Sequence, residues 1–188
     1  MGLQVKRAND KPTIKAIAHR VADIPGGVGV ATADLGGSAL LEGTPVTAIQ
    51  EDGLAHVVKT AKVMTRFSSG GTKIEVAKGH QFKAGQYIGD GTKAQKITDI
   101  DRSKEDKDVI TVGAALNQTF EAGSVLEECT GADAAVKYKD VAGVIGTSKN
   151  IEPGSNHGED VWVMAVVWEK NAPVSKRIKD ALKGVLYI

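Results

Sequence analysis

The amino-acid sequence predicts a mainly β fold with one short C-terminal helix. The stretch 72–128 consists of short runs rich in Val, Ile and Thr, separated by glycines and charged turns, and this pattern is typical of a small antiparallel module. The longest apolar run, 160–168, is dominated by Val and Trp and favours a central strand over a helix. Aromatic residues make up only 4% of the chain, so several thin β layers are expected instead of one large core.

Residues 1–39 differ from the rest of the chain. The segment 11–19 alternates apolar and polar residues, but Pro12 favours the edge of a sheet or an arm. Glycine and proline are dense over 24–37, and this density disfavours a packed domain. We therefore predict an extended arm over 1–39 that lies on a neighbouring surface. Its expected anchors are its large apolar residues Ile14, Ile17, Val21 and Ile24.

The regular part of the chain begins with a predicted strand at 45–49. Glu51-Asp52-Gly53 is the turn that leads from it to a second strand at 55–59. Further strands are expected at 141–146 and at 160–168, on the far side of the middle module.

Strands that flank the middle module can pair with each other, and this predicts how the chain is divided. Insertions are tolerated where the two chain ends lie close together on a surface. We therefore predict a β domain formed by 40–65 and 129–188, with an antiparallel β module inserted at 66–128.

One segment, 174–184, has the pattern of an amphipathic helix. Its apolar residues recur at helical spacing, Pro173 suits a first-turn position, and Gly184 suits the left-handed residue after the last turn. The apolar tail 185–188 is expected to pack or to pair with a strand. The residues on the apolar face are Val174, Ile178, Ala181 and Leu182.

Charge balance and cysteine content restrict the function classes. Lys and Arg total 24 against 23 Asp and Glu, a net charge of +1, so no global field attracts nucleic acid or an acidic membrane. Cys129 is the single cysteine, which excludes an internal disulfide, and we expect it to be semi-buried. No run approaches the ~20 apolar residues of a membrane helix, and the N-terminus lacks an apolar secretion core, so a soluble protein used without export is expected.

No segment carries a catalytic or metal-binding signature. Asp99–Asp108 is rich in acidic residues, but Lys and Ile stand where a calcium loop needs Gly and Glu, so a solvated hairpin loop is expected. Gly26–Gly29 lacks the ending of a phosphate-binding loop, and His157–Glu159 offers too few ligands for a metal. We interpret His80 as structural, and we predict no catalytic residue, no metal, no cofactor and no pocket where titratable side chains converge.

Trp162 and Trp168 allow two interpretations. In a strand both rings point to the same face. Packing in the core is the first interpretation, and an aromatic anchor at a subunit interface is the second. Both tryptophans are therefore candidate oligomer-interface residues.

Two parts of the sequence resemble small capsid decoration proteins of tailed bacteriophages. The first is Leu40-Leu41-Glu42-Gly43-Thr44-Pro45-Val46, followed by Glu51-Asp52-Gly53. The second comprises the closing segments 141–146 and 161–167 with the polar loop between them. The resemblance implies a decoration-type β domain.

The middle module and the C-terminal end resemble the head fibre family of phages and prophages of Bacteroidetes-type bacteria. The similar segments are Lys78-Gly79-His80-Gln81-Phe82-Lys83-Ala84-Gly85, 97–101, 108–113 and the short helix at 179–183 with its apolar tail. This resemblance implies a virion protein on the outer capsid surface, made in the cytoplasm of the bacterial host.

These observations predict a non-enzymatic structural protein that binds the outer surface of a phage capsid as a head fibre or decoration protein, with stabilisation of the shell as a further expectation. Its expected partners are the major capsid protein and two further copies in a homotrimer, with no nucleic acid and no membrane. The alternative is a host-surface or carbohydrate-binding module, which exposed aromatic residues on the middle module would indicate. An enzyme built on a β core is the third interpretation.

Overall fold

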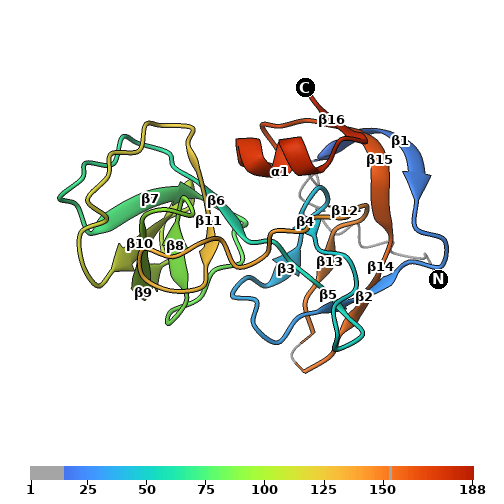
Figure 1. Cartoon of the computed structure of the whole chain (residues 1–188), viewed down its shortest axis with the longest axis horizontal. Coiled ribbons are helices and arrows are strands. Elements are labelled where there is room, and N and C mark those ends of the chain that lie inside the picture. The colour runs from blue at the N-terminus through green and yellow to red at the C-terminus, as the bar shows by residue number, and fades with distance from the viewer. Residues whose placement is uncertain (1–14, 153) are drawn as a thin grey trace, which may run out of the picture.

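Two β lobes lie side by side in the computed structural model, which describes residues 15–152 and 154–188 (Figure 1). One lobe, the inserted sheet, is formed by residues 60–129, and the other, the body, by chain on both sides of it. The expected mainly β class is confirmed, including its antiparallel sheets and the short helix near the C-terminus.

The inserted sheet has the strand order β6-β11-β8-β9-β10-β7. Buried and less buried residues alternate along β10 and β7, so one face of each strand packs into the core of this lobe. The edge strands β6 and β7 approach each other at a bridge between Val63 and Val76, and the sheet thus curls around buried side chains such as Phe82 and Ile88. The strands are β6 (Thr60–Lys62), β7 (Lys73–Ala77), β8 (Tyr87–Gly89), β9 (Ala94–Asp101), β10 (Lys107–Val112) and β11 (Val125–Cys129).

The body is organised around the apolar run expected to be a central strand. This run forms β15 (Val161–Val167), which pairs with β1 (Ile17–Asp23) along one edge. Its other edge pairs with β12 (Gly143–Ile145) and, in parallel, with β16 (Val185–Tyr187). The tail 185–188 therefore pairs with a strand, as expected. Strand β4 (Pro45–Val46) extends the sheet beyond β12.

Smaller sheets complete the body and surround a separate core that includes Val30, Leu40 and Ile145. Strand β2 lies between β14 and β5, and β3 pairs with β13. Gly53, with φ of 80°, lies in the expected turn between β4 and β5. These strands are β2 (Val28–Ala31), β3 (Ala39–Leu40), β5 (Ala55–His56), β13 (Lys149–Asn150) and β14 (His157–Glu159).

Helix α1 (Lys176–Ala181) covers the inner face of β15. Ser175 caps it by accepting a hydrogen bond from the Ile178 N–H, and Ile178 is fully buried against the sheet. The helix is shorter than the expected segment. Gly184 is not in the left-handed region, and this expectation was wrong. A Cβ at Gly184 would lie 2.4 Å from the Val163 carbonyl oxygen, so the glycine is required where β16 approaches β15.

The predicted extended arm over 1–39 is wrong for residues 15–39, because these residues are part of the body. Strand β1 is held by β15, and β2 is held by β14 and β5. The dense glycines form turns and close contacts. Gly27 has φ of 70°, and a Cβ at this position would lie 2.5 Å from the Glu159 carbonyl oxygen. Residues 1–14 lie outside the described part of the chain.

The inserted sheet begins earlier than the predicted boundary at residue 66. Strand β6 starts at Thr60 and pairs with β11, so the chain enters and leaves this lobe on neighbouring strands. Beyond β11, residue Val136 forms an isolated bridge with Cys129.

Two adjacent glutamates of β11 connect the lobes through ion pairs. Glu127 accepts hydrogen bonds from Ser175 and from the Arg177 guanidinium, at the start of α1 in the body. Glu128 lies 3.3 Å from Lys59 Nζ and 3.1 Å from Lys137 Nζ. Since neighbouring residues of a strand point to opposite faces, β11 is held from both sides.

Asp34 in the loop between β2 and β3 completes this junction. Its carboxylate lies 3.0 Å from Lys59 Nζ and 3.1 Å from Lys137 Nζ. Burial lowers the pKa of Lys59 despite the nearby carboxylates, whereas for the more exposed Lys137 burial is outweighed by Glu128 and Asp34, which raise its pKa. Two lysines and two carboxylates thus compensate one another between the lobes.

We predict that replacing Lys59 destabilises the whole protein. The Lys59 side chain is 1% exposed, and Lys59→Met leaves Glu128 with one fewer cation in a buried site. Breaking a buried ion pair costs about 3–5 kcal/mol, and the free energy of unfolding in urea measures this loss. The double variant Lys59→Met/Glu128→Leu is expected to recover part of it.

The control for this prediction is the exposed pair of Lys176 and Asp180 in α1. Lys176→Met is expected to cost less than about 1 kcal/mol, because exposed ion pairs contribute little. Equal costs for Lys59→Met and Lys176→Met would contradict a stabilising role of the junction.

Candidate functional site

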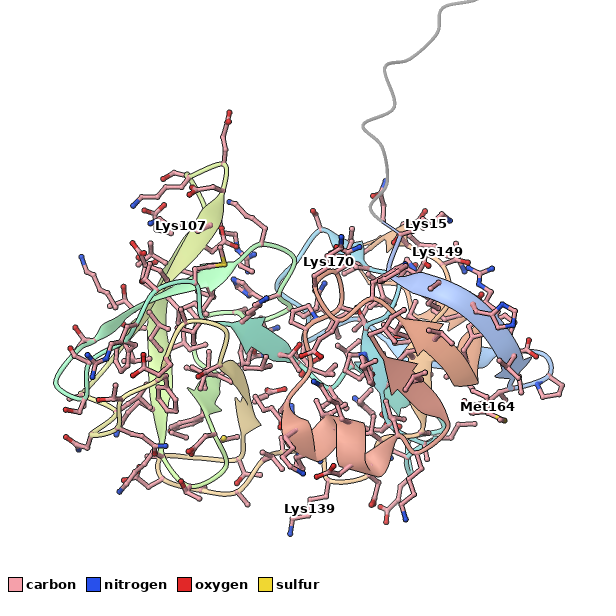
Figure 2. The ribbon with its side chains drawn as sticks, turned by 90° about the horizontal axis from the view of Figure 1, so that it is seen from above. Lys15, Lys107, Lys139, Lys149, Met164 and Lys170 are labelled. Carbon is pink, nitrogen blue, oxygen red and sulfur yellow. The ribbon has the colours of Figure 1, made fainter. Side chains whose placement is uncertain are left out.

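A cleft of about 670 Å³ lies between the two lobes. The inserted sheet contributes the end of β7 and the segment that follows it, 77–81. The body contributes residues around Leu41 and the segment after β15 that includes Lys170 and Pro173. Figure 2 shows Lys170 on the body, near its boundary with the inserted sheet. The volume is within the range of about 300–1,000 Å³ that is common for ligand pockets.

Asp108 of β10 is the centre of a charged cluster in the wall of this cleft. Its carboxylate is 1% exposed and lies 2.7 Å from Lys78 Nζ, 3.1 Å from His80 Nε2 and 3.5 Å from Arg102 Nη1. Lys78 also donates to the Arg102 carbonyl oxygen, and Arg102 donates to the Phe82 carbonyl oxygen. One buried carboxylate therefore fixes the positions of two cationic side chains.

His80 is buried and neutral at pH 7. Its Nδ1 accepts a hydrogen bond from the Phe82 N–H at 3.2 Å, which places the ring proton on Nε2. Burial, followed by the positive charge of Arg102, lowers the pKa of His80 to about 4. Nε2 has no well-directed hydrogen-bond partner among the described residues, although Asp108 lies close to it. The cluster thus has two cations for one carboxylate.

Two further lysines line the cleft without a carboxylate within 4.0 Å in the described part of the chain. They are Lys62 in the inserted sheet and Lys170 in the body. The remaining acidic residue of the cleft, Glu42, is buried and accepts a hydrogen bond from the Ile17 N–H at 2.8 Å. The cleft therefore carries an excess of positive charge and can hold an anionic group.

The expectation that titratable side chains do not converge in a pocket is wrong. Lys78, His80, Arg102 and Asp108 come from separate segments and meet at the cleft. His80 has the structural role expected of it, since it contacts Asp108 and the backbone of Phe82. Within residues 15–152 and 154–188, no group of three or more His, Cys, Asp or Glu is arranged to bind a metal ion.

The predicted arm anchors lie at different places. Ile14 is outside the described residues. Ile17 is buried in the body core beside α1, and Ile24 is half-buried against the core around Val30. Val21 is 57% exposed. Ile17 and Ile24 thus stabilise the body and are not free to bind a partner, whereas Val21 is accessible.

The two tryptophans lie in different environments. Trp162 packs partly against the body core and lies under the Arg20 guanidinium, 5.4 Å from the ring centroid. Trp168 follows β15 and is 41% exposed. Trp162 therefore fits the interpretation of core packing better, while Trp168 remains available to a partner.

The other sequence motifs take structural roles. The segment 99–108 forms the ends of the β9–β10 hairpin and its exposed loop, except that Asp108 is buried. His157 and Glu159 belong to β14, and Lys149 lies 3.2 Å from Glu159. Cys129 is buried, and burial raises the pKa of its thiol to about 11, so the thiol is protonated at neutral pH.

Sequence reasoning missed Lys62, Lys170 and Asp108 as members of one site. They lie in β6, after β15 and in β10, and only the packing of the two lobes brings them together. The one local signal was Asp108, an acidic residue that directly precedes the mostly apolar strand residues 109–112.

Searches among protein-family models, curated proteins and solved structures found no match to this chain. No helix in the described residues is long and apolar enough to span a membrane.

We predict that His80 makes stability depend on pH between about 4 and 6.5. In this window the unfolded chain binds a proton on His80 and the folded chain does not, so the free energy of unfolding falls as the pH falls. At pH 4.5 the loss from His80 amounts to about 2–3 kcal/mol. Urea titrations at pH 7.0, 5.5 and 4.5 measure it.

The variant His80→Asn is expected to flatten this dependence, because Asn can accept the Phe82 hydrogen bond but does not titrate. His19→Asn, at an exposed position of β1, is the control and is expected to leave the pH dependence unchanged. A pH profile of His80→Asn as steep as that of the wild type would contradict the buried neutral state of His80.

Proposed function

We propose that the protein is a non-enzymatic structural protein of a virion, which binds the outer surface of a phage capsid as a head fibre or decoration protein. The observation that supports this proposal is an exposed apolar face on the body, which extends from the far end of β15 toward the C-terminus. Such a molecule can attach by one end and project the other.

The apolar face consists of side chains on the outer side of β15 and β16. Residues 164 and 166 point to the same side of β15, opposite to the buried Ala165 and Val167, and the exposed Trp168 directly follows the strand. Leu186 of β16 is paired with Val166. The apolar face comprises Met164, Val166, Trp168, Leu186 and Ile188, and Met164, Leu186 and Ile188 are 47%, 61% and 50% exposed.

The position of the apolar face fits attachment to a shell. Strands β1 and β15 lie at the end of the body away from the inserted sheet (Figure 1), and Met164 lies at this end in Figure 2, whereas β16 and the C-terminus lie nearer α1. Contiguous exposed apolar residues mark interaction sites. Binding to the major capsid protein through this face would direct the inserted sheet away from the shell.

Assembly strengthens such a contact. Weak contacts repeated on a symmetric shell gain avidity when several copies are linked. A homotrimer supplies this linkage, and Trp168, exposed at the edge of the apolar face, is the tryptophan available to a neighbouring copy. Binding to the capsid surface, assembly as a homotrimer and location on the virion are parts of the same proposal.

The alternative, a host-surface or carbohydrate-binding module, has less support. Phe67, Phe82 and Phe120 of the inserted sheet are buried, and Tyr87 is half-buried. Carbohydrate recognition was expected to require exposed aromatic residues on this module. The capsid-binding proposal needs no such feature.

We predict that Met164→Glu/Leu186→Glu abolishes capsid binding. The two carboxylates place charge in an apolar contact, where an unpaired charge is strongly unfavourable. Co-sedimentation with empty heads of the phage or prophage that encodes the chain measures the bound fraction, which is expected to fall about tenfold or more. The urea unfolding midpoint is expected to change little, because both side chains are exposed.

The matched control is Ile49→Glu/Met64→Glu, which adds the same charge at exposed apolar positions outside the apolar face. This variant is expected to bind like the wild type. Normal decoration of heads by Met164→Glu/Leu186→Glu would refute attachment through the apolar face, and absence of binding by the wild-type protein would refute the proposed function itself.

A further inference from the structure

We propose that the cleft between the two lobes is a binding site for an acidic peptide segment of a partner protein, one that also carries aliphatic side chains. This site borders the apolar face, since Lys170 Nζ lies 5.9 Å from the centre of the Trp168 ring, and it goes beyond the proposed attachment to a capsid. It rests on the charge of the cleft, the apolar side chains within it and the hydrogen bonds that hold part of its walls.

The positive charge of the cleft indicates that the ligand is negatively charged. Lys62 and Lys170 line the cleft from opposite lobes and lack a carboxylate within 4.0 Å among the described residues. Lys170 Nζ also lies 5.9 Å from the centre of the Trp168 ring, at the border of the cleft. Lys78 and Arg102 share the single carboxylate of Asp108. An acidic segment that enters the cleft can therefore pair with cations on both walls, and clusters of basic residues are a known mode of acidic-motif recognition.

Apolar side chains that line the cleft indicate that the ligand also carries aliphatic side chains. Leu41 and Pro173 line the body wall, and Ala77 lines the opposite wall. Leu41 is 36% exposed, so its apolar surface is available for contact. Leu or Val side chains of a peptide can bury apolar area here while their acidic neighbours reach the lysines.

Hydrogen bonds hold part of the cleft walls in place before any ligand binds. Lys78 is held by Asp108 and by the Arg102 carbonyl oxygen. Across the boundary between the lobes, the Gln81 side chain donates to the Ala39 carbonyl oxygen and accepts from the Gly37 N–H. A site whose side chains are already positioned loses less conformational entropy on binding.

Two other classes of anionic ligand, single-stranded nucleic acids and acidic polysaccharides, fit less well. No Phe, Tyr or Trp is among the described residues that line the cleft. Proteins that bind single-stranded nucleic acid use aromatic side chains on which the bases stack. The apolar faces of sugar rings likewise pack against aromatic side chains. Small aliphatic side chains and lysines instead match an acidic peptide.

The experiment selects binders for the full-length chain from a displayed library of random dodecapeptides. The selected peptides are expected to be enriched in Asp and Glu, together with Leu, Ile or Val. Their affinities are then measured by fluorescence anisotropy for the wild-type chain and for Lys62→Glu/Lys170→Glu. Reversal of the two charges is expected to weaken binding about tenfold or more.

The control variant Lys96→Glu/Lys139→Glu changes the net charge by the same amount at exposed positions that do not line the cleft. Figure 2 shows Lys139 at the opposite edge of the body from Lys170. This variant is expected to bind the peptides within about twofold of the wild type, since long-range effects of exposed charges are screened. Both double variants are checked for an unchanged urea midpoint.

Three results would overturn the proposal. The first is a selected pool without an excess of acidic residues. The second is equal binding of the selected peptides by Lys62→Glu/Lys170→Glu and by the wild type. The third is preferential binding of an oligogalacturonate or of oligo(dT) over the selected peptides at equal concentration. Met164→Glu/Leu186→Glu is expected to bind peptides normally, so failure of the capsid proposal and failure of this one are distinguishable.

Discussion

The buried ion pairs of β11 are the interaction on which the arrangement of the two lobes depends. Glu127 is bound by residues at the start of α1, and Glu128 by Lys59 and Lys137. Buried charges are unfavourable unless they are paired, so this junction stabilises only the geometry in which all partners meet. A displacement of one lobe would leave charges buried without compensation, and the lobes therefore behave as one unit.

The two proposed surfaces follow from this constraint. The cleft exists because the inserted sheet is held beside the body, with Lys62 on one wall and Lys170 on the other. The apolar face exists because α1 covers the inner side of β15 and leaves the outer side open. A rigid junction keeps these two surfaces at fixed positions, which suits a protein that binds one partner at its end and another between its lobes.

The sequence predicted local structure well where periodicity and turn chemistry agreed. The runs at 72–76, 94–100 and 108–113 form β7, β9 and β10 nearly as expected, and alternating burial leaves a clear pattern in β7 and β10. The prediction failed for residues 15–39. Their glycines suggested an arm, but close contacts such as that of Gly27 with Glu159 require glycine in a packed structure.

The sequence by itself determined the β class, the central position of β15 and the place of the short helix, because these depend on neighbouring residues in the chain. Only the tertiary structure decided that β1 joins the body, that Asp108 is buried and that four cationic residues surround one cleft. The physical reason is that burial and electrostatic pairing depend on distances between segments far apart in sequence. No local pattern of residues encodes those distances.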